Sequence, residues 1–182
     1  MPRSPVPRSA ATIATVVIAT IVIATALMTI GSTAPAGAAD REPGSPRTRA
    51  YLATHPGGAA INDNQVSYGD GALIVTLARP AGTRAAADCP SGWFCFYDRV
   101  NFGYPRGQLN SCGWQDLAWW SWHDLTESVH YNISTGSVTF LNHATGTSHG
   151  NDQPLFSASS GNRTLDDVAP NRNRADHVYR YC

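Results

Sequence analysis

The chain has 182 residues and no formal net charge, because thirteen basic residues are balanced by thirteen acidic ones. All the basic residues are arginine, and they form no basic stripe of the kind that nucleic-acid binders carry. Nucleic acid is therefore not expected as a partner. The absence of lysine and the abundance of alanine and glycine are typical of a GC-rich genome, such as that of an actinobacterium.

The N-terminal segment has the pattern of a secretory signal. Arg3 and Arg8 precede a continuous run of Ala, Ile, Val, Thr, Leu and Met over residues 10–30, and Ala36-Gly37-Ala38 follows. A positive start, an apolar centre and an A-x-A exit are typical of a signal peptide. About 20 apolar residues can also span a bilayer, so a membrane anchor is the competing interpretation. We favour a signal peptide over residues 1–38, and expect a secreted, extracellular protein with no membrane contact after cleavage.

The four cysteines, Cys89, Cys95, Cys112 and Cys182, predict disulfides. Their number is even, and the chain is expected to enter an oxidising compartment. Three pairings are possible, and we favour Cys89–Cys95 with Cys112–Cys182. The chain-entropy model assigns about 2 kcal/mol to the shorter loop and about 4 kcal/mol to the longer one. The C-x5-C spacing differs from the C-x-x-C of redox pairs, so we expect both bridges to be structural.

The segment before the first cysteine divides into two parts. Residues 39–50 are rich in Pro and Arg and lack apolar periodicity, which predicts a linker. In residues 51–88, two β-rich runs flank Gly69-Asp70-Gly71, which predicts a hairpin because glycine supplies the positive φ of tight turns. This N-terminal hairpin segment is either an added strand pair or a removable pro-region. Its end, RPAGTRAAAD (residues 79–88), is expected to be a loop.

Residues 89–182 predict an all-β domain. Short aromatic or β-branched runs alternate with Gly/Asn/Asp turns, which is typical of a sandwich or barrel. One helical turn is expected in QDLAWWSW. GWFCFYDR resembles the later GSVTFLNH, and ESVHYN resembles DHVYRY, which indicates two units of about 45 residues. Two such units would suit a pair of Greek keys.

A family resemblance starts at the first cysteine. Tyr97 to Gly103, with Phe102 before the glycine, resembles the aromatic-x4-aromatic turn of βγ-crystallin Greek keys. CPSGWFCFYDRVNFG (residues 89–103) followed by Cys112-Gly-Trp-Gln-Asp-Leu resembles the secreted actinobacterial peptidase-inhibitor family of the Streptomyces metalloproteinase inhibitor type. The resemblance covers residues 89–182. It implies a βγ-crystallin-like sandwich of two Greek keys that inhibits thermolysin-like zinc proteases through a substrate-like loop.

The inhibitory loop itself does not map onto this chain. In the family, as the resemblance implies, it lies in a second small disulfide loop, and no cysteine lies between Cys112 and Cys182. Two candidate protease-contact loops are Ser91-Gly92-Trp93-Phe94 inside the first disulfide, and Leu155-Phe156. Thermolysin-like pockets favour a large apolar side chain just after the scissile bond, which both stretches offer. A plain turn and a buried strand are the alternative interpretations.

Metal sites are expected to be weak or absent. βγ-crystallin calcium sites combine two Asn/Asp with a later Ser/Thr-Ser, supplying the oxygen ligands that Ca²⁺ prefers. The matching stretch here keeps Asp124 and Ser128, which predicts at most weak calcium binding and no other cofactor. His143, His149 and Asp152 have side chains that can ligate metal, but loop histidines are more often exposed to solvent.

The tryptophans Trp114, Trp119, Trp120 and Trp122 allow two explanations. Bulky rings fill the core of a small sandwich, and exposed rings mark binding surfaces. The sequence leaves both explanations open.

No pattern in the chain predicts an enzyme. Neither H-E-x-x-H nor G-x-S-x-G is present, and the adjacent Asp166 and Asp167 would point to opposite faces of a strand. Our first hypothesis is a monomeric secreted inhibitor of extracellular (metallo)proteases. The alternative is a non-inhibitory βγ-crystallin-like secreted protein with a structural, cell-wall, carbohydrate-binding or weak calcium-binding function.

Overall fold

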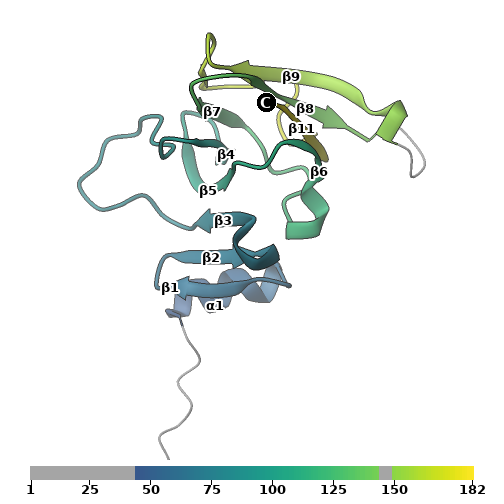
Figure 1. Cartoon of the computed structure of the whole chain (residues 1–182). Helices are drawn as coiled ribbons and strands as arrows, with labels where there is room; N and C mark the ends of the chain where they lie inside the picture. Colours follow the sequence, from purple (N-terminus) through teal and green to yellow (C-terminus); the bar gives the residue numbers. More distant parts are fainter. Residues whose placement is uncertain (1–43, 144–148) are drawn as a thin grey trace, which may run out of the picture. The chain divides into compact units, whose positions relative to one another are not determined.

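The computed structural model describes residues 44–143 and 149–182, so the predicted signal peptide lies outside the described residues. In this part of the chain, eleven strands form two antiparallel sheets (Figure 1). One short α-helix precedes the strands. No helix in the described ranges is long and apolar enough to cross a membrane. The prediction of an all-β sandwich with an added N-terminal hairpin is confirmed.

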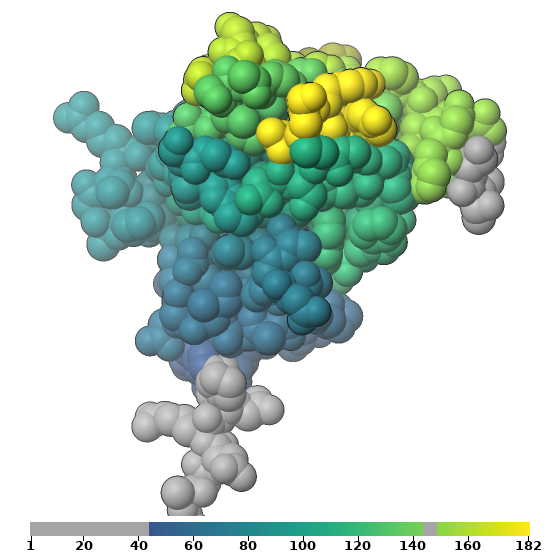
Figure 2. All heavy atoms as spheres, viewed as in Figure 1, coloured from purple at the N-terminus to yellow at the C-terminus, as the bar shows by residue number. Residues whose placement is uncertain are grey.

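The larger sheet joins the N-terminal segment to the cysteine-containing region. Its strands, in spatial order, are β1 (Ala59–Asn62), β2 (Gln65–Tyr68), β3 (Leu73–Thr76), β5 (Gly103–Leu109), β4 (Trp93–Arg99), β7 (Ser128–Asn132) and β10 (Thr164–Leu165). The smaller sheet has the order β6 (Gly113–Asp116), β11 (His177–Tyr181), β8 (Ser137–Asn142) and β9 (Gln153–Ser159). In Figure 2 the C-terminal residues (yellow) lie at the surface, and Tyr179 and Tyr181 of β11 are exposed.

Three 3-10 turns complete the fold: η1 (Gly69–Gly71), η2 (Leu117–Trp120) and η3 (His149–Asn151). The first closes the predicted β2–β3 hairpin, and the second is the helical turn expected in QDLAWWSW. Both predictions are confirmed.

The internal repeat of the sequence has a structural counterpart. In each half, the fourth strand pairs with the first: β7 with β4, and β11 with β8. The third strand of each half, β6 or β10, joins the opposite sheet. Asp116 and Asp167 also make the same local turn, because each side chain accepts a 2.8 Å hydrogen bond from the backbone two residues later. The Greek-key description of the halves stays a prediction, because neither third strand lies beside its second strand.

The linker prediction for residues 39–50 is wrong in its described part. Residues Pro46–Thr54 form the helix α1, and its N-cap Ser45 accepts a hydrogen bond from the Thr48 backbone at 3.3 Å. Serine at the N-cap followed by proline in the first turn is a standard helix start. Weak apolar periodicity concealed this helix, because few of its side chains face the core.

The N-terminal hairpin segment is not a separate body. Strand β3 pairs with β5, so Val75 lies opposite Gly107. Val75 is fully buried in the same apolar cluster as Phe96. A Cβ at Gly107 would lie 2.3 Å from the Phe96 ring, so glycine is required where this ring crosses the strand. The boundary predicted at residue 88 therefore does not divide the fold.

The core is built around aromatic rings that meet edge to face. Phe96 is fully buried, with the rings of Trp122 and Phe140 at 5.1 and 6.1 Å between centroids. Trp120 is also buried, whereas Trp119 is 61 % exposed. Of the two explanations that the sequence left open, core filling therefore applies to Trp120, and an exposed ring applies to Trp119.

Candidate functional site: a clamped surface loop

A long irregular connection between β3 and β4 stands out from the sheets (Figures 1 and 2). Residues 77–92 contain no helix or strand, and residues 80–86 are all exposed. Loops of this length without regular structure are usually functional or disordered. The loop predicted over residues 79–88 is confirmed, and side-chain contacts tie it to the β4–β5 turn.

A tight turn fixes the first half of the loop. The Pro80 carbonyl accepts hydrogen bonds from the Thr83 backbone N–H at 3.3 Å and from the Thr83 hydroxyl at 2.7 Å. Gly82 has a φ of 81°, which the third position of a type II turn requires.

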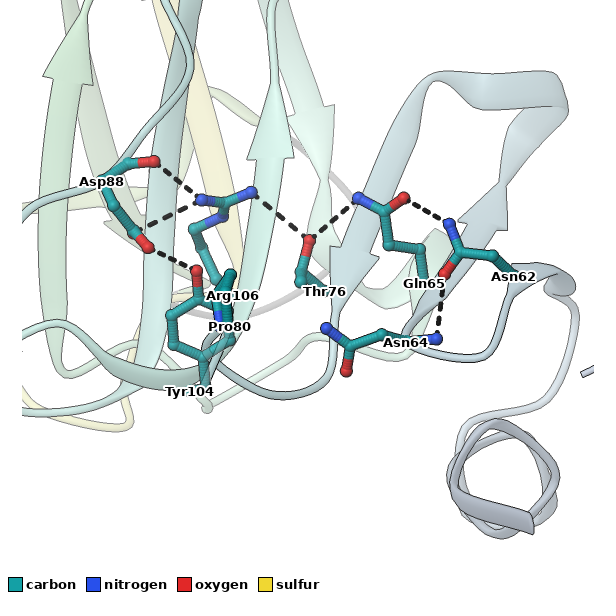
Figure 3. Close-up of a pocket in the computed structure, with 8 residues that line it drawn as sticks. All are labelled: Asn62, Asn64, Gln65, Thr76, Pro80, Asp88, Tyr104 and Arg106. Atoms are coloured by element: carbon teal, nitrogen blue, oxygen red, sulfur yellow. Dashed lines mark hydrogen bonds and ion pairs between the residues drawn. The ribbon is translucent and has the colours of Figure 1, made fainter. Parts of the chain in front are cut away.

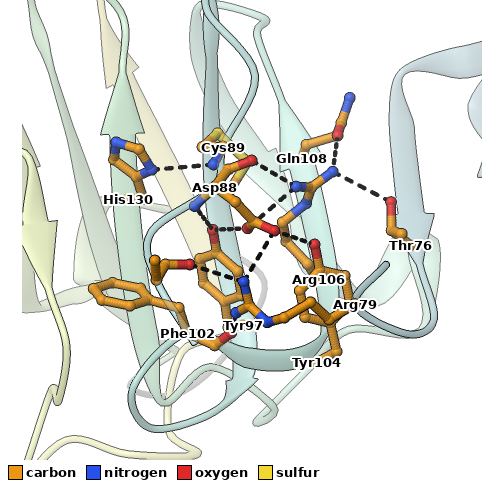
Figure 4. Close-up of polar contacts among 12 residues, drawn as sticks. Thr76, Arg79, Asp88, Cys89, Tyr97, Phe102, Tyr104, Arg106, Gln108 and His130 are labelled. Carbon is orange, nitrogen blue, oxygen red and sulfur yellow. Dashed lines mark hydrogen bonds and ion pairs between the residues drawn. A yellow bond between two sulfur atoms is a disulfide. The ribbon is translucent and has the colours of Figure 1, made fainter. Parts of the chain in front are cut away.

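The Arg79 guanidinium fixes the second half. Its Nη1 donates to the carbonyls of Arg84 and Ala86, each at 3.1 Å. The same nitrogen lies 3.3 Å from the Asp88 carboxylate. Its Nη2 donates to the Phe102 carbonyl at 2.6 Å (Figure 4). One partly buried side chain therefore ties the loop to its own C-terminal end and to the β4–β5 turn.

Asp88 anchors the far end of the loop. Its carboxylate accepts hydrogen bonds from the hydroxyls of Tyr104 at 2.5 Å and Tyr97 at 2.9 Å. Arg106 lies 3.3 Å from the same carboxylate and donates to the Asp88 backbone carbonyl at 2.8 Å. Burial alone would raise the pKa of Asp88, but these hydrogen bonds and the charges of Arg106 and Arg79 hold it below 3.8. Asp88 therefore stays ionised in moderately acidic solution.

The cluster around Asp88 extends into the sheet through Arg106. Arg106 is 6 % exposed and donates to Gln108 at 2.9 Å and to Thr76 at 3.3 Å (Figure 4). The guanidinium groups of Arg79 and Arg106 also lie 5.0 and 5.6 Å from the centre of the Tyr104 ring, within cation–π range. Burial and the hydrogen bond to Asp88 raise the pKa of Tyr104 to about 12. The loop base is thus a connected polar network.

A polar hollow of about 390 Å³ lies at this base (Figure 3). Its lining residues are Asn62, Asn64, Gln65, Thr76, Pro80, Asp88, Tyr104 and Arg106. Several of them bond to one another, as Asn62 does to Gln65 at 2.8 Å and Gln65 to Thr76 at 3.3 Å. Most of these groups bond within the chain, although Arg106 Nε has no hydrogen-bond partner among the described residues. We treat the hollow as part of the loop support and assign it no ligand.

The first disulfide follows directly after the loop. Cys89 and Cys95 are bonded, with their Cα atoms 5.5 Å apart. The Cys89 backbone donates to His130 Nδ1 at 3.1 Å, and Asn132 donates to the Cys89 carbonyl at 2.8 Å. Burial lowers the pKa of His130, which favours the neutral ring that this hydrogen bond needs. The second bridge joins Cys112 to Cys182, so the predicted pairing is confirmed.

The chain matches no protein-family model, no curated protein and no solved structure. The assignment of the site therefore depends on its geometry.

The first predicted protease-contact loop is a tight turn. Ser91 and Gly92 are exposed, but the Gly92 backbone N–H donates to the Asn132 carbonyl at 2.8 Å. Trp93 is half-buried, and Phe94 is fully buried in the core. The prediction that Phe94 contacts a protease is wrong, because the strand alternation of β4 turns its ring inward.

The second predicted contact loop is a strand. Leu155 and Phe156 lie in β9 and are half-buried. The Phe156 ring stacks on Phe140 at 4.8 Å, and Asn171 donates to the Leu155 carbonyl at 3.0 Å. Neither side chain is presented to a partner in this conformation.

The predicted crystallin-type turn folds back on itself. The rings of Tyr97 and Phe102 meet edge to face at 5.5 Å, and Phe102 has a positive φ of 59° just before Gly103. Ser128 anchors this turn, since its hydroxyl donates to the Arg99 carbonyl at 2.7 Å and accepts from the Phe102 backbone at 3.0 Å.

Asp124, the other residue of the predicted calcium site, is exposed and has a φ of 55°. Partial burial and the charge of Asp176 raise the pKa of the Asp124 carboxyl. Weak calcium binding at Asp124 and Ser128 stays a prediction.

The residues that support the loop were not singled out from the sequence. Arg79 and Asp88 flank a stretch with no large apolar residue, and this pattern indicates an exposed loop with opposite charges at its two ends. Tyr104 and Arg106 gave no such signal, because they reach Asp88 only through the pairing of β5 with β3 and β4.

Proposed function

We propose that the protein is a secreted inhibitor of extracellular peptidases that presents residues 80–86 to its target. The observation that supports this function is the clamp of Arg79 on an otherwise exposed loop. A loop that is ordered before binding loses little conformational entropy in the complex. The two disulfides are compatible with export to an oxidising compartment.

The half of the loop that Arg79 engages, residues 84–86, has one candidate reactive bond. Serine peptidases stabilise the carbonyl oxygen before the scissile bond in an oxyanion hole, so this oxygen must be accessible. The carbonyls of Arg84 and Ala86 are engaged by Arg79. The carbonyl of Ala85, between them, has no hydrogen bond to any described residue. The bond between Ala85 and Ala86 is therefore our candidate.

This assignment favours peptidases with a small primary pocket. Ala85 would occupy that pocket, and elastase-type enzymes have a pocket of this size. Residues 80–86 contain only Pro, Ala, Gly, Thr and Arg. They lack the large apolar side chain that thermolysin-like enzymes favour, so we place elastase-type serine peptidases first.

Titration of the purified protein against elastase, trypsin and thermolysin tests the function. We expect stoichiometric inhibition of elastase. Ala85→Arg should weaken it by about 100-fold and produce trypsin inhibition, because the pocket discriminates by size and charge. Ala53→Arg, at an exposed position of α1, is the matched control and should change neither elastase inhibition nor trypsin inhibition.

Each other outcome has a distinct meaning. Inhibition of no peptidase at a large molar excess would refute the inhibitor function. Inhibition that Ala85→Arg leaves unchanged would show that the reactive site lies elsewhere. Inhibition of thermolysin alone would support the metalloproteinase prediction against the loop assignment.

A second function is favoured by the exposed aromatic side chains near β11. Trp119 is 61 % exposed, Tyr181 is 53 % exposed and Tyr179 is 38 % exposed. Exposed aromatic surfaces mark binding sites, and cell-wall carbohydrate is the ligand that the alternative hypothesis names. Sedimentation with insoluble peptidoglycan tests it: Trp119→Ala and Tyr181→Ala should lower the bound fraction, and Ile61→Ala, an exposed apolar control on β1, should not.

A further inference from the structure

A cluster of histidine and aspartate side chains lies at one end of the smaller sheet, apart from the loop and its supporting network. Asp116 ends β6 and His177 begins β11, and these two residues are directly opposite in the antiparallel pairing. Cross-strand partners place their side chains on the same face of a sheet. His123 follows η2 and reaches the same place. None of the three supports the loop of residues 80–86.

The atoms of this trio converge. The Asp116 Oδ1 lies 3.0 Å from His123 Nε2 and 3.9 Å from His177 Nε2. All three potential ligand atoms lie within 4.8 Å of one another. Ligands of a tetrahedral zinc ion, with bonds of about 2.0–2.1 Å, lie about 3.3 Å apart. Small side-chain movements would therefore give the zinc geometry.

Both histidines of the trio have a carboxylate near the ring nitrogen Nδ1. His177 Nδ1 lies 2.6 Å from Asp152, and His123 Nδ1 lies 3.5 Å from Asp176. A carboxylate at one ring nitrogen accepts its N–H and orients the ring when a metal binds the other nitrogen. In both rings that other nitrogen is the Nε2 that faces Asp116. This pairing of ligand and carboxylate is characteristic of protein zinc sites.

The supporting groups are held in place. Asp152 has 2 % side-chain exposure and also accepts a hydrogen bond from the Trp114 indole at 3.2 Å. His177 has 5 % side-chain exposure, so its ring orientation is fixed by packing. His123, with 41 % exposure, leaves the outer side of the trio open to solvent. A metal ion could reach the trio from that side and keep a water as its fourth ligand.

We propose that Asp116, His123 and His177 bind a divalent transition-metal ion, with Zn²⁺ as the preferred ion. Two imidazole nitrogens and one carboxylate oxygen are a common zinc donor set, whereas calcium and magnesium take oxygen ligands. Three protein ligands leave one coordination position for solvent or for a donor from a partner.

A neighbouring trio is the competing assignment. His143, Asp152 and His177 Nδ1 also lie within 4.8 Å of one another. There the Asp152 carboxylate already contacts His177, Trp114 and His143. A metal in that place would displace the 2.6 Å contact of the buried Asp152 side chain with His177. A metal at the proposed trio would displace only the 3.0 Å contact of Asp116 with the exposed His123. We therefore assign the ion to the Nε2 side of His177.

Calorimetric titration of untagged, chelator-treated protein with Zn²⁺ tests the proposal. The wild type should bind one ion, and His123→Ala should weaken binding by at least about tenfold, the lower end of the effect of disturbing a metal site. His143→Ala is the matched control, since its side chain is 34 % exposed against 41 % for His123, and it should bind as the wild type does. Near-UV circular dichroism and the midpoint of thermal unfolding verify that both variants are folded.

Two results would overturn the proposal. The first is a wild type that binds no Zn²⁺ at millimolar concentration. The second is loss of binding in His143→Ala but not in His123→Ala, which would move the ion to the Asp152 trio. Neither result depends on whether the protein inhibits a peptidase.

Discussion

Arg79 and Asp88 form an ion pair, with Nη1 3.3 Å from Oδ2, that closes the exposed loop at its base. Their side chains have 16 % and 30 % exposure, so the pair is partly shielded from water. Hydrogen bonds of Arg79 to two loop carbonyls and of Asp88 to two tyrosines extend it. The loop between them is therefore open at its tip and ordered at its ends, as a substrate-like inhibitor requires.

Arg79→Ala should loosen this loop. The substitution removes charge-assisted hydrogen bonds to Arg84, Ala86, Phe102 and Asp88, and hydrogen bonds to charged groups each contribute about 1.5–3 kcal/mol. Allowing for compensating water, we expect about 2 kcal/mol less free energy of unfolding in urea. We also expect faster proteolysis within residues 80–86 and weaker peptidase inhibition.

The control for this experiment is Arg172→Ala. Arg172 pairs with Asp167 on the surface, where both side chains are well exposed. Exposed ion pairs contribute little to stability, so this variant should behave nearly as the wild type does. Equal losses in the two variants would show that Arg79 has no special function in the loop.

Asp88 should make the free energy of unfolding depend on pH. The unfolded chain takes up a proton on this residue near pH 3.8, whereas the folded carboxylate keeps its depressed pKa and stays ionised at lower pH. The stabilisation by Asp88 is thus fully present above about pH 4 and is lost as the pH falls through the folded pKa. Urea unfolding from pH 2 to pH 7 should show that wild type exceeds Asp88→Asn at neutral pH, with the difference shrinking in acid. A difference that is constant with pH would contradict the ionised network.

Local signals were sufficient for much of the fold. Gly69-Asp70-Gly71 predicted a hairpin because a tight turn depends on glycine at the turn itself and not on distant residues. The pairing of Cys112 with Cys182 was favoured among three possible pairings because the cysteine count is even and the chain was expected to enter an oxidising compartment. The helix α1 was missed because a short helix with few buried side chains has weak periodicity.

Contacts between distant residues could not be predicted. Arg79 meets the Phe102 carbonyl, and His177 lies beside Asp116, only because strand register brings them together. Register depends on the packing of both sheets and cannot be obtained from one segment. Strand alternation likewise decided that Phe94 faces the core. The candidate site was therefore predicted only as an irregular loop, without its supporting side chains.

Ser128→Ala should destabilise the β4–β5 turn regardless of calcium. The variant loses a hydrogen bond to the Arg99 carbonyl and leaves the Phe102 N–H without its partner in a partly buried place. An unsatisfied buried donor destabilises by about 1–3 kcal/mol. Thermal unfolding should show this loss both with Ca²⁺ and with chelator. Ser157→Ala, an exposed serine on β9, is the control. A loss seen only when Ca²⁺ is present would instead support the calcium site.

The two disulfides should contribute differently. Removing Cys112–Cys182 should lower the free energy of unfolding by about 4 kcal/mol, and removing Cys89–Cys95 by about 2 kcal/mol, because the longer loop restricts the unfolded chain more. The shorter bridge adjoins the exposed loop, so its double serine variant should also lose inhibition. The variant without the longer bridge should keep inhibition while it remains folded. Inhibition lost only with the longer bridge would place the inhibitory segment near the C-terminus.

A chain that begins at residue 79 should not fold. It lacks five buried apolar side chains that belong to the main core: Val66, Tyr68, Leu73, Val75 and Leu77. Burying one such side chain contributes about 1.5–3 kcal/mol, and five of them match the whole stability of a typical domain, about 5–15 kcal/mol. The truncation also uncovers the edge of β5, whose free backbone groups favour aggregation.

Near-UV circular dichroism and urea unfolding measure this outcome, with a chain that begins at residue 44 as the folded control. Cooperative unfolding of the shorter chain would contradict the shared core and support a removable pro-region. Loss of the folded signal in the shorter chain alone would show that strands β1 to β3 are permanent parts of the sheet that supports the loop of residues 80–86.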